Sequence, residues 1–157
     1  MPFGPASLLG VERFSDESEA PIELVPCDDD ARKEEIIRAV YKQVLGNAYV
    51  MDSERQVVAE SQFKLGEISV RELVRRIAKS DLYRSRFFES CARYRYIELA
   101  FRHLLGRAPA DFEEMRGHSE RLDSSGYDTD IDSFVDSDEY QNAFGEWTVP
   151  FLSLIHI

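Results

Sequence analysis

An internal repeat constrains the fold of this chain more than any other feature of its sequence. The stretch VYKQVLGNAYVMDSER, residues 40–55, recurs sixty residues later as AFRHLLGRAPADFEEM, residues 100–115. A second block recurs at an offset of 57, where the matched pairs are Ser80 and Ser137, Asp81 and Asp138, Tyr83 and Tyr140, and Phe87 and Phe144. Two blocks in the same order predict a duplicated helical hairpin unit, in which each half buries its apolar face against the other.

Apolar residues recur at helical spacing, and few segments alternate as strands do. One of the acids at 28–30 is expected to cap a helix whose inward face is Ile36, Ile37, Val40, Tyr41 and Val44. Gly46 ends this helix and Gly106 ends its repeat, because glycine adopts a left-handed conformation without steric cost. Residues 124–126, Ser-Ser-Gly, separate the predicted helices near 110–123 and 130–144.

The segment between the two repeats is also predicted to be helical. A helix at about 52–65 is expected to turn Val57, Val58 and Phe63 inward. Ser69 is expected to cap the next helix, with Glu72 completing a capping box, and further helices are predicted at about 81–90 and 93–105. The sequence therefore predicts an all-α fold, a single domain of about six or more helices.

Charge is unevenly distributed in a chain whose net charge is −11. Residues 1–35 carry ten acids and three bases, and residues 108–147 carry twelve acids and two bases. Between them, residues 71–107 carry ten Lys or Arg and four acids. Two interpretations remain open: helix faces that neutralise each other within the fold, or a polarised surface that orients a charged partner.

Catalytic and nucleic-acid-binding functions find little support. The two cysteines, Cys27 and Cys91, form no CxxC or Cys/His ligand cluster, so neither a zinc site nor a disulfide scaffold is expected. His103 and His118 lie in no HExxH or nucleophile motif, so the chain is not expected to be an enzyme. The stretch RYRYIELAFRH alternates arginines with aromatics, but its aromatics fit a core stripe and the net charge opposes a polyanion.

The strongest candidate for a metal site is DTDIDSFVDSDE, residues 128–139. It places Asp128, Asp130, Asp132 and Glu139 at the first, third, fifth and twelfth positions of a calcium loop. Its sixth position is Ser133, where the sharp turn requires glycine, and the apolar residues between the acids have helical spacing. The spacing of the acids keeps a small calcium-binding helical module as the alternative function. The serine and the helical spacing count against it, so no metal ligand is assigned.

Four stretches closely resemble the linker-polypeptide domain of phycobilisomes: IIRAVYKQVLGNAYVMDSER, ESQFKLGEISVRELVRRIAKSDLYRSRFF, RYRYIELAFRHLLGRAP and DIDSFVDSDEYQNAFGEWTVPF. The opening MPFGPASLLGVERF most resembles phycoerythrin-associated rod linkers. The resemblance implies a non-enzymatic linker in the cavity of phycobiliprotein α/β hexamers, of phycoerythrin or phycocyanin. Such a linker organises the discs of the rod and tunes bilin energy transfer.

The resemblance also implies the partners and the location. Neighbouring discs and linkers are the other expected partners, with no nucleic acid and no membrane insertion. Bilins of the phycoerythrobilin type, carried by the partner subunits, are contacted and not bound covalently. The expected location is peripheral, at the stromal or cytoplasmic face of the thylakoid in a red-algal chloroplast or a cyanobacterium. The residues expected to contact the partner are Phe3, Arg13, Phe14, Tyr49, Arg75, Arg76, Arg84, Arg86, Tyr94 and Trp147.

Three segments are expected along the chain. Residues 1–27 hold four of the six prolines and form an extended N-terminal arm that acts as a separable tether. Residues 28–151 form the linker domain. Residues 152–157, LSLIHI, depart from the family and are expected to be a non-native tail. Rod linkers of this family usually continue into a second, small domain.

Overall fold

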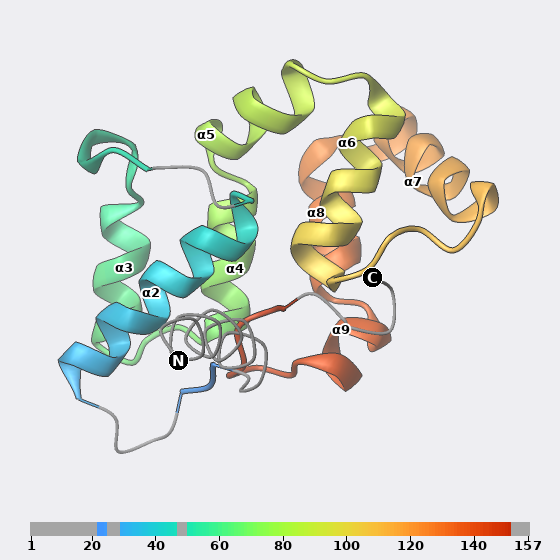
Figure 1. The fold of residues 1–157 in the computed structure, drawn as a ribbon. Helices are drawn as coiled ribbons and strands as arrows, with labels where there is room; N and C mark the ends of the chain where they lie inside the picture. The colour runs from blue at the N-terminus through green and yellow to red at the C-terminus, as the bar shows by residue number, and fades with distance from the viewer. Residues whose placement is uncertain (1–21, 25–28, 47–49, 152–157) are drawn as a thin grey trace, which may run out of the picture.

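The computed structural model describes residues 22–24, 29–46 and 50–151 of the chain. Within these residues the regular elements are helices, and strand pairing is limited to one antiparallel bridge between Glu23 and Thr148. The all-α prediction is therefore confirmed. No described helix is both long enough and apolar enough to span a bilayer. The helices are α2 (Asp30–Val44), α3 (Val57–Lys64), α4 (Val70–Ala78), α5 (Asp81–Tyr83), α6 (Arg93–Ala100), α7 (Phe112–Ser125), α8 (Tyr127–Val135) and α9 (Asp138–Ala143) (Figure 1).

Three short segments of other helical types accompany these elements. A 3₁₀ turn, Asp52–Glu54, precedes α3. A π-helical segment, Arg84–Glu89, continues α5, and another, Phe101–Leu105, continues α6 up to Gly106. The predicted helices at 81–90 and 93–105 are thus present, each with a wider final part.

The helices begin where side chains cap them. Asp29 caps α2 by accepting a hydrogen bond from the backbone N–H of Arg32 at 2.9 Å. Ser69 caps α4 in the same way, through the N–H of Glu72 at 3.2 Å. The other half of the predicted capping box is replaced, because the Glu72 carboxylate forms an ion pair with Arg76 on the next turn, 3.5 Å away.

The structure confirms the duplicated pattern of helix stops and starts. Gly46 and Gly106 both have positive φ, 64° and 73°, and so do Gly66 and Gly126, 79° and 91°. Both pairs are sixty residues apart. The offset changes to 57 immediately afterwards, because α4 begins four residues after Gly66 and α8 begins directly after Gly126. Residues 67–69 are therefore three extra residues in the first repeat.

The second matched block has the same local geometry in both repeats. Ser80 caps α5 by accepting from the N–H of Tyr83, and Ser137 caps α9 by accepting from the N–H of Tyr140. Both tyrosines are completely buried. Ser137 also corrects one prediction, because it starts a new helix inside the range 130–144, for which the sequence predicts a single helix.

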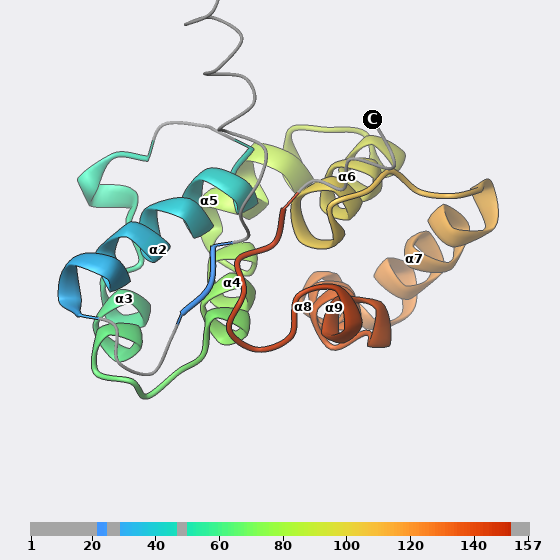
Figure 2. The same cartoon turned by 60° about the horizontal axis from the view of Figure 1, so that its bottom comes forward.

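Equivalent elements of the two repeats face each other. The first repeat, α2 to α5, and the second, α6 to α9, lie side by side in both ribbon views (Figures 1 and 2). Helix α4 packs against its counterpart α8. Gln43 and its counterpart His103 also meet, because the Gln43 amide donates to the carbonyl oxygens of Arg102 and His103 at 3.3 Å. The core is therefore shared between the halves.

Residues 22–24, the described part of the expected arm, pair with the chain that follows α9. The N–H of Leu24 donates to the carbonyl of Trp147 at 2.9 Å, and the N–H of Val149 donates to the carbonyl of Ile22 at 2.8 Å. Ile22 and Leu24 also pack against the core. We call these two segments, 22–24 and 147–149, the terminal ribbon. The rest of the arm and the tail 152–157 lie outside the described residues.

Candidate partner-binding surface

Arg75 and Arg76, two of the expected contact residues, form ion pairs within the domain. Arg75 pairs with Asp136 and lies 3.6 Å from Asp132. Arg76 pairs with Glu72 and donates to the side chain of Gln62. Both guanidinium groups are therefore already paired with acidic side chains of this chain.

Arg84 and Arg86 lie at the junction of the repeats. Arg84 stacks over the rings of Phe88 and Tyr127, at 5.7 and 5.3 Å from the ring centroids. Arg86 lies 3.6 Å from the carboxylate of Glu54. Both side chains thus have contacts within the domain before any partner arrives.

Other bases of the 71–107 segment also form ion pairs within the domain. Arg71 at the start of α4 donates to the carbonyl of Val135 at 2.7 Å and pairs with Glu146 at 2.8 Å. Arg107 pairs with Glu114 and Glu139 at 2.8 and 2.9 Å.

These ion pairs have electrostatic consequences. The guanidinium groups lower the pKa of Glu146 and of Glu114, because each carboxylate accepts a charge-assisted hydrogen bond. Of the two interpretations of the charge pattern, mutual neutralisation within the fold is the one that the structure supports.

Two expected contact residues are exposed aromatics. Tyr94 is 41% exposed and Trp147 is 47% exposed. The Tyr94 ring lies beside that of Phe112, with centroids 5.6 Å apart, and Phe112 is itself 61% exposed. Sequence reasoning missed Phe112, although its position as the first residue of a helix, outside the core stripe, was a usable signal. Phe3, Arg13, Phe14 and Tyr49 lie outside the described residues.

Helix α3 exposes a second apolar surface, which corrects the sequence prediction. Val57 and Val58 were expected to point inward, but they are 65% and 71% exposed. Phe63, also expected to point inward, is fully buried, so that part of the prediction is confirmed, and Leu65, just after the helix, is 75% exposed.

The acids of the candidate calcium loop do not converge, because they lie within α8 and α9. Asp130 is completely buried and accepts hydrogen bonds from the hydroxyl of Tyr96 at 3.1 Å and from His118 at 2.7 Å. Asp132 pairs with Lys79, and Glu139 pairs with Arg107. Among the described residues no group of three or more His, Cys, Asp or Glu side chains is placed to hold a metal ion. The helical geometry contradicts the calcium-loop alternative.

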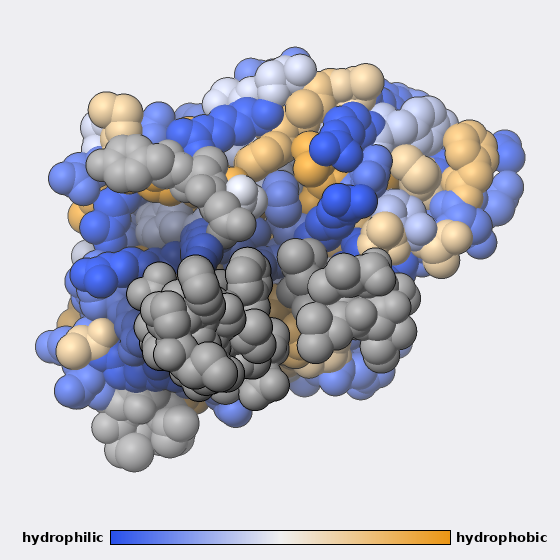
Figure 3. All heavy atoms as spheres, viewed as in Figure 1, coloured by the Kyte–Doolittle hydropathy of each residue, from blue (hydrophilic) through white to orange (hydrophobic). Residues whose placement is uncertain are grey.

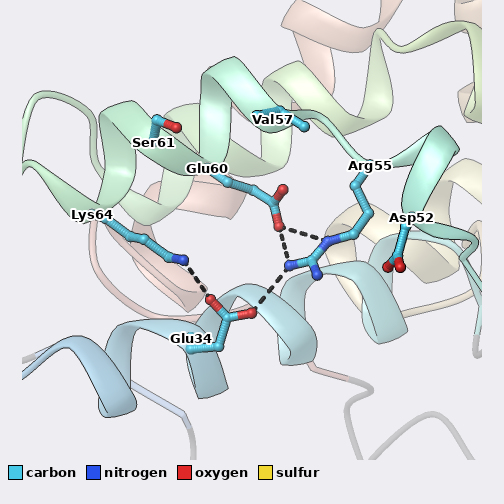
Figure 4. A pocket seen from close by; sticks show the side chains of 7 residues that line it. All are labelled: Glu34, Asp52, Arg55, Val57, Glu60, Ser61 and Lys64. Carbon is cyan, nitrogen blue, oxygen red and sulfur yellow. Dashed lines mark hydrogen bonds and ion pairs between the residues drawn. The ribbon is translucent and has the colours of Figure 1, made fainter.

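A surface pocket lies between α2 and α3, and Figure 4 shows its lining. Charged residues occupy it: Glu34 pairs with Lys64 at 2.7 Å and with Arg55 at 3.1 Å, and Arg55 also pairs with Glu60. The hydrogen bonds from Lys64 and Arg55 lower the pKa of Glu34. The network joins α2 to α3 and brings no nucleophile next to a base, so it has the character of a structural ion-pair ladder.

Residues 28–153 match the family described as phycobilisome linker polypeptide. This chain belongs to that family. The linker is 65% identical over 152 residues to the 31.8 kDa phycoerythrin-associated rod linker polypeptide of Microchaete diplosiphon, covering 97% of this chain and 52% of that protein. A 27.9 kDa phycoerythrin-associated rod linker of the same organism is 56% identical over 134 residues, which are 85% of this chain and 54% of that protein.

A phycocyanin-associated rod linker is similar at a lower level. The 32.1 kDa protein of Nostoc sp. is 50% identical over 147 residues, which are 93% of this linker chain and 50% of that protein. The chain spans about half the length of the curated relatives it matches.

Proposed function

We propose that this chain is a non-enzymatic structural linker of the phycobilisome rod and that its partner is a phycoerythrin hexamer. One observation carries the proposal: 65% identity, over nearly the whole chain, to a relative named as phycoerythrin-associated. Identity to the phycocyanin-associated relative is lower, at 50%. The domain would sit in the central cavity of the hexamer and order neighbouring discs. It would then lie at the stromal or cytoplasmic face of the thylakoid, as a peripheral component of the antenna.

The geometry supports contact through apolar and aromatic side chains. Bases such as Arg71, Arg75 and Arg107 form ion pairs with acids of the domain, so they offer little free charge to a partner. Exposed apolar side chains are instead the groups that lose contact with water on docking. Tyr94 and Trp147 remain our candidates for contact with the cavity wall or with the phycoerythrobilin-type bilins of the partner.

Reconstitution tests the proposal. The purified chain is mixed with phycoerythrin or with phycocyanin, and the products are separated on a sucrose gradient. We expect the chain to co-sediment with phycoerythrin and to shift it towards larger assemblies, with a weaker effect on phycocyanin. Separate sedimentation of the chain and both biliproteins would overturn the proposal.

The arm is proposed to reach beyond the domain. Residues 1–21, which precede the terminal ribbon, can extend to roughly 70 Å at about 3.3 Å per residue. A segment rich in proline and poor in helical pattern adds reach without a core of its own. Its apolar residues would order on docking to a neighbouring disc.

A further inference from the structure

The apolar face of α3 is the largest departure from the expected pattern of burial. Val57, Val58 and, just after the helix, Leu65 are each more than half exposed, while Ala59 and Phe63 on the opposite side of the helix are buried. In the view of Figure 3 the end that carries α3 shows only small, separate hydrophobic spots, and a broader hydrophobic area lies near α6. Exposed valine and leucine gathered on one helix face indicate an interaction surface.

The fold does not require these residues to be apolar. At the offset of sixty that relates the repeats, Val57 corresponds to Gly117 and Leu65 corresponds to Ser125. All four positions are exposed. At these two positions the second repeat builds the same part of the helix without a hydrophobic side chain, so the fold does not need Val57 and Leu65 to be apolar.

Contacts with α2 hold α3, and so its apolar face, in place. The hydroxyl of Tyr41 accepts from the N–H of Gln56 at 2.7 Å, and Lys33 donates to the carbonyl of Lys64 at 2.9 Å. The ladder of Figure 4 connects Glu34 on α2 with Lys64 on α3. A surface that is already ordered loses little conformational entropy when a partner binds.

Charge identifies the kind of occupant. Asp52 and Glu67 lie in the chain just before and just after α3, both are exposed, and neither forms an ion pair with another described residue. A second copy of the same face would bring acid against acid, which is unfavourable. The arm is also disfavoured, because residues 1–21 carry four acids and one base.

We propose that the α3 face binds an amphipathic helix of a phycobiliprotein subunit, apolar at its centre and basic at both ends. Val57 and Leu65 are about 12 Å apart along a helix axis, at 1.5 Å per residue, which matches two turns of the incoming helix. The basic ends of that helix would meet Asp52 and Glu67. This inference rests on the proposed function and identifies the α3 face as the surface through which the domain contacts its partner.

The apolar part is tested with a composition-matched variant. Leu65→Ser combined with Ser125→Leu moves one leucine from the α3 face to the equivalent position of α7. We expect binding to phycoerythrin, measured by co-sedimentation over a range of concentrations, to weaken at least tenfold. Ser125→Leu alone should leave it within about twofold. Circular dichroism checks that each variant remains folded, which we expect because both sites are exposed.

The charged part is tested by reversal. Asp52→Lys with Glu67→Lys should weaken binding at least tenfold, whereas the control Glu113→Lys with Glu120→Lys, which makes the same net change on exposed residues of α7, should leave it within about twofold. Unchanged binding in the Asp52/Glu67 and Leu65/Ser125 variants, with a wild-type chain that binds, would overturn this inference and leave the proposed function standing. A wild-type chain that does not bind would overturn the proposed function itself.

Two further measurements separate the other occupants. Sedimentation equilibrium showing a wild-type dimer that Leu65→Ser converts to a monomer would assign the face to a second copy. Hydrogen exchange showing protection of 57–65 that is lost on deletion of residues 2–21 would assign it to the arm. Either result would overturn the inference, and a monomer with an unprotected α3 face would support it.

Discussion

At the scale of single residues, Gly46 illustrates how the contact between repeats restricts the sequence. Its φ is +64°, and a Cβ added there would lie 2.9 Å from Nε2 of the buried His103. We expect Gly46→Ala to lower the free energy of unfolding by about 2–4 kcal/mol, from left-handed strain and the clash together. Gly66→Ala is the control, because its φ is +79° with nothing within 4 Å of the added Cβ; it should cost about 1 kcal/mol. Urea denaturation measures both, and equal losses would contradict the role of His103.

His103 itself predicts a pH dependence of stability. Burial, with a smaller contribution from Arg102 and Arg95, lowers its pKa from 6.5 to about 4. As the pH falls from 6.5 towards 4, the unfolded chain binds a proton that the native state does not bind, so stability falls, by up to about 3 kcal/mol.

The variant His103→Gln isolates this effect, since Gln43 occupies the equivalent position of the first repeat. Its unfolding free energy should fall less than that of the wild type between pH 7 and pH 4. Carboxylates titrate in both proteins, so the difference between the two curves reports His103. Parallel curves would show that His103 does not contribute.

At the scale of elements, Arg71 connects the start of α4 to the end of α8. Its side chain is 14% exposed, donates to the Val135 carbonyl and stacks 5.5 Å from the ring centroid of Tyr140. We expect Arg71→Ala to destabilise the domain by about 2–3 kcal/mol, because a hydrogen-bonded charge is removed from a partly buried carbonyl. Arg76→Ala should cost less, about 1 kcal/mol, since its ion pair with Glu72 is partly exposed and its hydrogen bond to Gln62 is made to a neutral amide. Thermal unfolding compares the two, and similar losses would contradict this assignment.

The terminal ribbon provides a sharper boundary for the arm than the sequence did. Deletion of residues 2–21 should leave the melting temperature almost unchanged and weaken assembly of neighbouring discs. Deletion of residues 2–24 should also lower the melting temperature by several degrees, because it removes the backbone hydrogen bonds to Trp147 and Val149. A large loss of stability on the shorter deletion would show that the arm folds onto its own domain.

The sequence predicted local features of these elements well and long-range ones poorly. Ser69 and Gly106 were predictable because a cap and a left-handed stop act on adjacent residues. The orientation of Val57 and Val58 was not, because a short apolar run does not say which side of a helix meets the core. The partners of Arg71 and Arg75 lie more than fifty residues away in the chain, and charge composition alone cannot pair them.

At the scale of the whole molecule, the shared core predicts that neither repeat folds alone. Fragments 1–92 and 93–157 separate the halves between the π-helical segment after α5 and the start of α6. Each would expose the face that α4 and α8 bury against each other. We expect each fragment to show little helical circular dichroism and an equimolar mixture to recover most of it. Cooperative unfolding of either fragment by itself would contradict this prediction.

The antiparallel direction of the terminal ribbon determines how the domain carries load. Residues 21 and 150 continue from the same end of the ribbon, because Ile22 is hydrogen-bonded to Val149. A force that pulls residues 21 and 150 apart would break the hydrogen bonds of the ribbon one at a time, before the force acted on any helix. We therefore expect the ribbon to open at a lower force than the helical core, because its hydrogen bonds are loaded one after the other and not together.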